Sequence, residues 1–457
     1  MVDQKHPFDW QRHPEAEQLL INLLDEACRA NQAIALFKDD LYHRTSTRLF
    51  DWLDHISVGT EPELEMKLGE LGFEEESAGA AYRVYRHPGA QLPSLIVEDT
   101  SKGVSAIAVK VENIADFLMV RGMPAVIEGT PFARYRRCQV NIDQGVALYV
   151  IERRGTRTME PTHQDGNYLQ RYLEGQEAWK RRPRDLEEED EAICHMLLLA
   201  ERLVAELGTD TAAWLVLECE RDLWQARNKA AQIQKARQDR LGMGWANHDH
   251  HTFRSSRRHF TSLVRLFEIL GFHCRERYYA GEEAGWGAQV MENSTAGLIL
   301  FLDTDLTPEE LDIDFAHQTI PEIEQLGTVG LWCELHGDSI LKAGMHHLEA
   351  QFFFDELRTD LQEQGVQLME PFSNFTYLKQ AFTQAEHWQV DPRRVEKLLS
   401  REWIGPEQAE QFLTEGAVGS HLENLQRRDG YKGFNQKNVS FIIKKTDPRL
   451  SQSSGTS

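Results

Sequence analysis

The residues with the clearest chemical potential lie in NHDHHTFR, residues 247–254. On a strand alternate side chains share a face, so His250, Thr252 and Arg254 would point the same way. A neutral imidazole is the commonest protein metal ligand, and a guanidinium suits a two-point grip on a carboxylate. The pattern predicts a metal-bound oxo acid, with Arg254 as the catalytic and substrate-binding residue and Thr252 beside it. A polar surface strand or a hydrogen-bonded core histidine is the alternative interpretation.

Two further residues complete a first candidate ligand set. Asp54 and His55 in DHISVG match the Asp-His pair of the later segment, and Glu152 lies in ALYVIERRG, the strand that closes an earlier unit. His250, His55 and Glu152 would form a two-histidine, one-carboxylate triad with open coordination positions. Those positions would take substrate and dioxygen on ferrous iron, or water and substrate on a redox-silent metal. A solvated strand end is the alternative for Glu152.

A second group of candidate ligands lies further along the chain. His347 and Glu349 in MHHLEA would share one face of a strand, and Glu334 lies in GLWCEL, another expected strand. We rank this group second. The sequence contains no phosphate loop, GxSxG elbow, HExxH helix or GxGxxG fingerprint after a strand, so hydrolase, kinase and dinucleotide-binding functions lack support.

Repeated strand-helix-strand patterns would position these residues. Residues 50–155 hold two consecutive copies of one plan, and a third begins at NHDHHTFR, where a helix again ends in a Leu-Gly-Phe step. We expect an α+β protein built from repeated βαβββ units that form half-barrels, with added helical segments. The expected regions are an N-terminal helical segment (1–48), paired units (49–158), a helical connector (159–245), a second paired region (246–355), a mainly helical region (356–450) and a disordered tail (451–457).

The expected structure after residue 309 rests on weaker patterns. GLWCEL and HHLEAQFFF are expected to be strands, 376–428 mostly helical, and NVSFIIKK a final strand.

Composition restricts the partners. The 457 residues include 50 Lys and Arg against 73 Asp and Glu, a net charge of −23, which argues against nucleic acid or an anionic membrane as partner. No signal segment or long apolar run is present, so the cytoplasm is the expected compartment. The six cysteines form no CxxC pair and are expected to be reduced. A small carboxylate is the expected ligand, and the sequence gives no indication of oligomeric state.

The repeated units, each opening with a strand that can carry a histidine, resemble the vicinal oxygen chelate superfamily. Within it, DHHTFR followed by a helix and LGF is similar to the metal and substrate motif of the 2-oxoadipate dioxygenase/decarboxylase family, and His250 and Arg254 fall on that motif. GLILFLDTDLTPEEL, RGMPAVIEGTPF and YVIERRG are similar to its other segments. Together these cover about 150 residues, and they imply half-barrels around one metal.

The order of these segments departs from the family pattern, because the glutamate-like unit precedes the DHHTFR unit. The strand SAIAVKV, which would supply the second histidine, offers only Ala106 and Ala108, and the family glutamate falls nearer Val150 than Glu152. Either His55 substitutes, or residues 50–155 form a metal-free scaffold. In that second case His250 would bind the metal together with C-terminal residues such as Glu334, His347 or Glu349.

The resemblance implies an enzyme, a non-haem iron oxygenase or decarboxylating dioxygenase for a small 2-oxo acid. Fe(II) is the expected cofactor, with Mn, Zn or Ni as alternatives. A metal-dependent lyase or isomerase of the glyoxalase type would use the same site without redox chemistry. The remaining alternative is a non-catalytic binding or scaffold protein of this fold.

Overall fold

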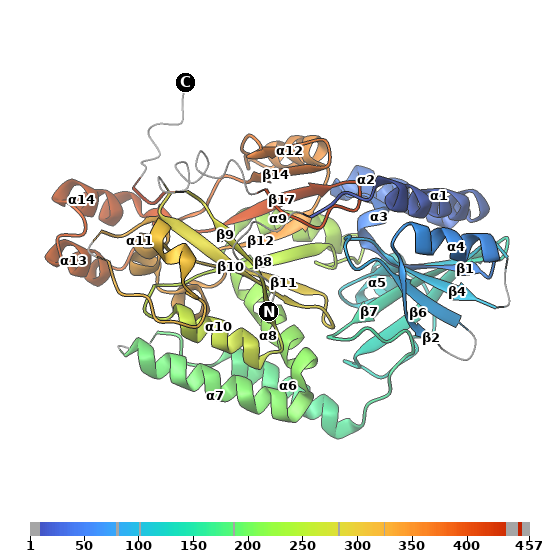
Figure 1. Cartoon of the computed structure of the whole chain (residues 1–457), viewed down its shortest axis with the longest axis horizontal. Coiled ribbons are helices and arrows are strands. Elements are labelled where there is room, and N and C mark those ends of the chain that lie inside the picture. The colour runs from blue at the N-terminus through green and yellow to red at the C-terminus, as the bar shows by residue number, and fades with distance from the viewer. Residues whose placement is uncertain are drawn as a thin grey trace.

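The computed structural model describes residues 10–78, 82–99, 102–185, 188–281, 284–323, 325–435 and 447–449. Two mixed β-sheets lie side by side, the first at the right of Figure 1 and the second at the left, and helices cover both. The expected strand NVSFIIKK and the expected tail at 451–457 lie outside the described residues.

The first sheet contains two consecutive units. Its order is β2-β3-β4-β1-β5-β7-β6, so the opening strands β1 and β5 are antiparallel neighbours at the centre, each flanked by the parallel last strand of its unit. The strands are β1 (Leu53–Gly59), β2 (Glu74–Ala78), β3 (Tyr82–Arg86), β4 (Ser94–Glu98), β5 (Val104–Lys110), β6 (Tyr135–Asp143) and β7 (Val146–Arg153).

Five helices accompany the first sheet. Pro14 stands in the first turn of the N-terminal helix, and Asn31 caps the next one by accepting a hydrogen bond from the Ala33 amide at 3.0 Å. Their apolar faces pack with the sheet in one buried cluster. The helices are α1 (Pro14–Ala30), α2 (Gln32–Thr45), α3 (Leu49–Trp52), α4 (Pro62–Glu70) and α5 (Ile114–Arg121).

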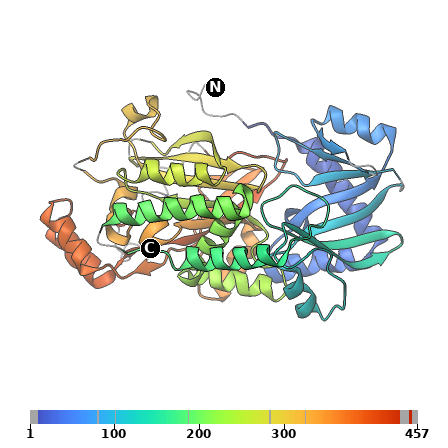
Figure 2. The same cartoon turned by 90° about the horizontal axis from the view of Figure 1, so that it is seen from below.

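Four helices connect the two sheets, in the segment where a helical connector was expected. They are α6 (Gly166–Lys180), α7 (Glu189–Leu207), α8 (Thr209–Ala226) and α9 (Lys229–Asp239). Helices α7 and α8 lie beneath the second sheet in Figure 1 and appear in front of it in Figure 2.

The second sheet has the order β13-β14-β17-β12-β8-β11-β10-β9. Its opening strands β8 and β12 are again antiparallel neighbours, flanked by the parallel closing strands β11 and β17. The strands are β8 (His248–Arg254), β9 (His273–Tyr279), β10 (Trp286–Asn293), β11 (Leu298–Asp305), β12 (His347–Gln351), β13 (Ser373–Asn374), β14 (Leu378–Phe382) and β17 (His421–Arg427). A small separate sheet pairs β15 (His387–Trp388) with β16 (Ala417–Val418).

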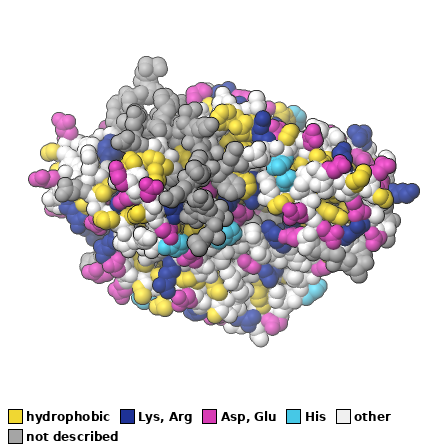
Figure 3. All heavy atoms as spheres, viewed as in Figure 1, with side chains coloured by type: hydrophobic (Ala, Val, Ile, Leu, Met, Phe, Trp, Pro, Cys, Tyr) yellow, Lys and Arg dark blue, Asp and Glu magenta, His cyan; other side chains and the backbone are white. Residues whose placement is uncertain are grey.

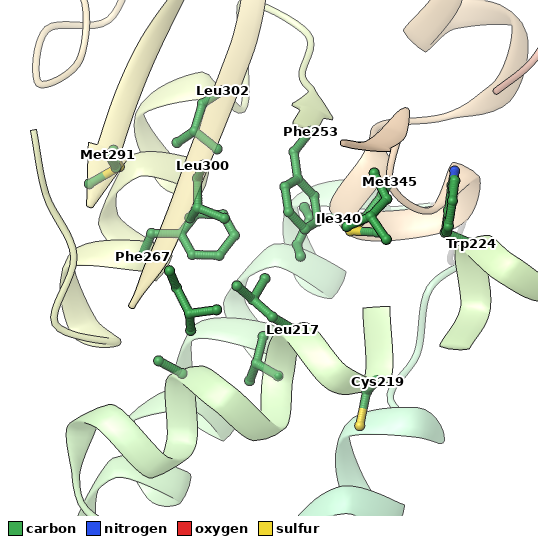
Figure 4. Packing of buried hydrophobic residues seen from close by; sticks show 14 of the residues in the cluster. Leu217, Cys219, Trp224, Phe253, Phe267, Met291, Leu300, Leu302, Ile340 and Met345 are labelled. Carbon is green, nitrogen blue, oxygen red and sulfur yellow. The ribbon is translucent and has the colours of Figure 1, made fainter. Parts of the chain in front are cut away.

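The main hydrophobic core lies between the second sheet and its helices. Leu217 of α8 faces Phe253 of β8, with Phe267 and Leu300 beside them (Figure 4). Alternate residues of β8 thus point into this core, which leaves His250, Thr252 and Arg254 on the opposite face. The helices of this half are α10 (Phe260–Ile269), the 3₁₀ turn η1 (Pro308–Asp312), α11 (Thr328–His336), the π-helical turn η2 (Ser339–Ala343), α12 (Phe354–Glu363), α13 (Pro392–Ser400) and α14 (Pro406–Glu415).

Two expectations for the C-terminal half are wrong. GLWCEL is the helix α11, because the Asp305 carboxylate accepts hydrogen bonds from the amides of Gly327 (2.7 Å) and Val329 (3.0 Å) and so caps the start of a helix. The apolar residues of GLWCEL are too few to show whether their spacing has the period of a strand or that of a helix. Residues 376–428 are not mostly helical, since β14 and β17 enclose α13 and α14. The strand expected at HHLEAQFFF is confirmed as β12.

The expected α+β class, with repeated βαβββ units arranged in two mixed sheets, is confirmed. Three units follow the plan βαβββ or extend it, and β5-α5-β6-β7 has one strand fewer. Acidic and basic side chains are interspersed on the face shown in Figure 3. Within the described ranges, no helix combines the length and apolar composition that a bilayer span requires.

Candidate metal centre

Three neighbouring strands of the second sheet bring ligand-type side chains to one face. In the β8–β12 pair His250 lies opposite Glu349, and in the β12–β17 pair Glu349 lies opposite Glu423. His347, two residues before Glu349, lies opposite His421. Residues that face each other across a sheet share a face, so all five side chains converge.

His250, His347 and Glu423 form one compact group of potential metal ligands. One potential ligand atom from each lies within 4.8 Å of the others, and all three residues are buried. Glu423 Oε2 lies 2.8 Å from His347 Nε2, which also lies 2.9 Å from Thr252 Oγ1. Two imidazoles and one carboxylate on adjacent strands have the composition of a facial triad.

A second carboxylate supports this set from behind. Glu349 Oε2 is in close contact with His250 Nδ1, and the Gln380 amide donates to both Glu349 Oε1 (3.1 Å) and Glu423 Oε1 (3.2 Å). Burial, followed by the neighbouring charge of Glu423, raises the pKa of Glu349 well above its usual range. Burial also raises the pKa of Glu423. The two carboxylates therefore repel each other unless a proton or a cation lies with them.

Asp249 orients His250 from the neighbouring position. Its Oδ1 lies 3.3 Å from His250 Nδ1, and the Arg427 guanidinium holds it at 3.1 Å and 3.3 Å. Burial would raise the pKa of Asp249, but Arg427 and the His250 hydrogen bond outweigh it and lower that pKa below its usual range. Asp249 is thus a fixed negative charge behind the imidazole.

Two more histidines adjoin the triad. His421 stacks on His347 with ring centres 5.0 Å apart, and the His346 ring centre lies 4.6 Å from that of His421. Burial, then neighbouring positive groups, lowers the pKa of all three well below the usual range. They are therefore neutral, the state in which imidazole nitrogens bind metals.

Arg254 lies in the same pocket with part of its guanidinium unused. It is 3% exposed, and among the described residues its Nε and Nη1 have no hydrogen-bond partner. Asp303 is the main acidic group acting on it, and burial raises the pKa of Asp303 to about 7. The pocket measures about 80 Å³, and its walls are mainly aromatic: Tyr278, Trp286, Phe301, Phe372, Phe382 and Phe434.

His55 and Glu152, the other members of the first-ranked set, lie in the first sheet and not beside His250. His55 Nδ1 contacts Asp54 Oδ2 at 2.7 Å. Glu152 is 1% exposed and accepts from Arg136 Nη1 (3.0 Å) and the Ile114 amide (3.2 Å), besides a close contact with Arg154. Three donors occupy its oxygens, so Glu152 holds strands and a helix start together.

The second-ranked residues are divided. His347 and Glu349 lie at the site on β12, as the alternation in MHHLEA indicates. Glu334 is on α11, where its carboxylate accepts from Lys397 Nζ at 2.8 Å. Thr252 lines the pocket between His250 and Arg254.

Glu423 and His421 were missed by sequence reasoning. They stand in HLENLQR, where His421 and Glu423 would share one strand face, but a helix was expected over this region. The alternation of His421 and Glu423 before Arg427 is the signal that indicates the strand.

No family model matches this sequence, and no curated protein matches it. Among solved structures, a triple mutant of 4-hydroxymandelate synthase from Streptomyces coelicolor is 12% identical over 90% of this chain and 99% of that chain, with a TM-score of 0.28. Methylmalonyl-CoA epimerase from Mycobacterium tuberculosis is 11% identical over 40% and 88%, with a TM-score of 0.23. Glyoxalase I from Zea mays is 11% identical over 22% and 43%, with a TM-score of 0.18.

Proposed function

We propose that this protein is a non-haem Fe(II) oxygenase that oxidatively decarboxylates a small 2-oxo acid. The observation that carries the proposal is the coexistence, in one buried pocket, of the His250–His347–Glu423 group and the unpaired guanidinium nitrogens of Arg254. In this pocket, a metal ion on the three ligands would bind the chelating oxygens of an oxo acid, and Arg254 would bind its carboxylate.

The residues present fit a divalent cation. With Nδ1 of His250 facing Asp249 and Glu349, the free lone pair of that ring lies on Nε2, the arrangement of a carboxylate–histidine–metal triad. A cation would also remove the repulsion between Glu349 and Glu423. The mixed nitrogen and oxygen donors suit iron, and manganese, zinc or nickel are the alternatives.

When bound, a ferrous ion would supply chelation of the oxo acid and activation of dioxygen. Arg254 would bind a substrate carboxylate, and its fixed charge would orient the oxo group toward the triad. Phe301 and Phe434, whose ring centres lie 4.6 Å and 4.8 Å from that of His250, would exclude water. Thr252 would keep the His347 ring in place through its hydroxyl group.

The substrate class rests on the resemblance of DHHTFR to the 2-oxoadipate dioxygenase/decarboxylase family. All six cysteines are unpaired, which supports a reducing compartment such as the cytoplasm. A pocket of about 80 Å³ favours a short substrate chain.

The test is metal content by elemental mass spectrometry on untagged protein purified without oxygen, followed by an oxygen electrode with a panel of 2-oxo acids. We expect near-stoichiometric iron that is lost in Glu423→Ala and kept in His55→Ala. Turnover without oxygen uptake would favour the lyase or isomerase. A fully folded protein that takes up no metal after reconstitution, and whose melting temperature iron and manganese leave unchanged, would favour the scaffold function.

A further inference from the structure

A second cavity lies between the two sheets. It measures about 700 Å³, within the range of small-molecule sites, and shares no lining residue with the metal pocket. Asp54 and Lys110 line it from the first sheet, and Asp249 lines it from the second. Helix α8 adds Trp214 and Arg221. The two halves of the molecule therefore enclose it together.

Lys110, at the end of β5, enters this cavity without a counter-ion. Among the described residues no carboxylate lies within ion-pair distance of its ammonium group, and burial lowers its pKa. The three carboxylates that act on it are already engaged: Asp54 by Arg153 (2.6 Å), Asp249 by Arg427 (3.1 Å) and Asp51 by Arg48 (2.6 Å). The positive charge of Lys110 is therefore not compensated by these carboxylates, because each of them already pairs with an arginine.

Arg221 is a second cation without a counter-ion. It is 2% exposed and lines the cavity, and its Nε has no hydrogen-bond partner in the part of the chain that the structure describes. Its Nη1 lies 3.2 Å from His251 Nε2. A histidine side chain carries no negative charge in either protonation state, so His251 does not compensate the charge of Arg221. A buried guanidinium without an anion is costly.

Aromatic rings lie beside the two cations. The Arg221 guanidinium lies 5.6 Å from the Trp214 ring, which is 5.8 Å from the His248 ring. His248, next to the Trp214 ring, also lines this cavity. Trp245 completes this wall, and the carboxylates of Glu74 and Glu75 lie at the exposed rim.

We propose that this inter-sheet cavity binds a small organic dianion. One negative charge pairs with Lys110, the other pairs with Arg221, and the carbon skeleton packs against Trp214 and Trp245. The two cations that have no ion-pair partner among the described residues match two negative charges on the ligand, and the rim carboxylates disfavour larger polyanions.

Isothermal titration of the full-length protein with succinate at low ionic strength tests this, with uncharged succinamide as the ligand control. We expect Lys110→Met and Arg221→Gln each to weaken succinate binding at least tenfold, and succinamide not to bind. Lys67→Met, an exposed lysine of α4, is the matched control and should bind as the wild type does. Unchanged affinity in both cavity variants would overturn the proposal.

Succinate is also a candidate for the metal pocket, so Arg254→Gln separates the two sites. Unchanged affinity in that variant supports the inter-sheet cavity, whereas loss of binding there would place succinate at Arg254 and overturn the proposal. This result is independent of whether the metal pocket catalyses an oxygenation.

A footprint on the wild-type protein avoids any effect of substitution on folding. Reductive methylation read by mass spectrometry should modify Lys110 in free protein and should modify it several-fold more slowly with saturating succinate. Lys67 should react at the same rate in both samples. Equal labelling of Lys110 with and without succinate would contradict the proposal.

Discussion

The two sheets have the same central arrangement but different side chains at matching positions. In both, antiparallel opening strands lie between parallel closing strands, and the registers set His55 beside Ala108 in the first sheet and His250 beside Glu349 in the second. Ala106 then matches His347, since Ala106 lies two residues before Ala108 and His347 lies two residues before Glu349. The first sheet thus keeps one potential ligand where the second has several.

The closing strands extend this comparison. Ala108 pairs with Tyr149, whereas Glu349 pairs with Glu423, so a tyrosine stands where the metal centre has its carboxylate. By the same registers, Gly59 stands at the position of Arg254. Ala108 packs in a small cluster with neighbouring aromatic and aliphatic side chains. The first sheet lacks both the metal ligands and the carboxylate anchor.

What both sheets retain is an Asp–Arg pair, buried in the second sheet and part-buried in the first. Asp54 pairs with Arg153 in the first sheet as Asp249 pairs with Arg427 in the second, and each arginine lies four residues after the tyrosine or glutamate of its closing strand. Each arginine also donates to carbonyl groups of the chain that follows its strand. The pair is therefore structural in origin, and the ligands are an addition that the same frame can carry or lack.

The largest expected effect is the loss of metal from the second sheet alone. We expect His347→Ala and Glu423→Ala to reduce bound metal to background and turnover by at least about 100-fold, because each removes a direct ligand. His55→Ala and Glu152→Gln should keep their metal, as measured by elemental mass spectrometry. Metal loss in His55→Ala would mean that the sheets share one site.

The two Asp–Arg pairs should be equivalent in stability. Arg153→Met and Arg427→Met each leave an aspartate with little solvent access without its arginine, so each should lower the free energy of unfolding by about 3–5 kcal/mol in urea titrations. Only Arg427→Met should also weaken metal binding, because Asp249 contacts His250. Equal weakening by Arg153→Met would contradict the separation between the sheets.

Arg254→Gln sharpens the difference at the substrate anchor. Losing a charge-assisted hydrogen bond of about 1.5–3 kcal/mol should raise KM for the 2-oxo acid about 10- to 150-fold, with metal content unchanged. Steady-state kinetics beside elemental analysis would show this. A variant with unaltered KM would remove Arg254 from substrate binding.

The smallest expected effect is a change in acid sensitivity of the first sheet. Burial raises the pKa of Asp54, but Arg153 outweighs it, so the folded pKa lies well below the usual range. Its pairing therefore stabilises the fold above about pH 4 and is lost as the pH falls further.

Asp54→Asn should therefore flatten the decline of stability below pH 4 by up to about 1.4 kcal/mol per pH unit, the contribution of one proton. Urea titrations at several pH values measure this slope. Asp116→Asn, at an exposed position of α5, is the control and should decline as the wild type does. An unaltered slope in Asp54→Asn would show that the pair does not control acid stability.

Sequence reasoning reached the parts of the site that depend on local patterns. Alternation on one strand is enough to group His250, Thr252 and Arg254, and repetition of the units indicates the half-barrels. It placed His347 and Glu349 second because their pairing with His250 depends on strand register, which is a non-local property.

Glu423 was beyond reach for a related reason. Its strand pairs with β12 and β14, yet two helices, α13 and α14, separate it from β14 in sequence and make the whole region look helical. Glu152 shows the opposite case. Its position on a strand is correct, but its partner Arg136 becomes a neighbour of its carboxylate only through the pairing of β6 with β7.

The late position of β17 also decides when the metal centre can exist. Glu423 follows His250 by 173 residues, so at about 5–20 residues per second the ribosome makes the carboxylate roughly 10–35 s after the first histidine. The last strand of the first sheet ends at Arg153, so all the strands of that sheet are synthesised long before Glu423. Assembly of the proposed metal site therefore requires synthesis through Glu423, and products that end before it carry the histidines without this carboxylate.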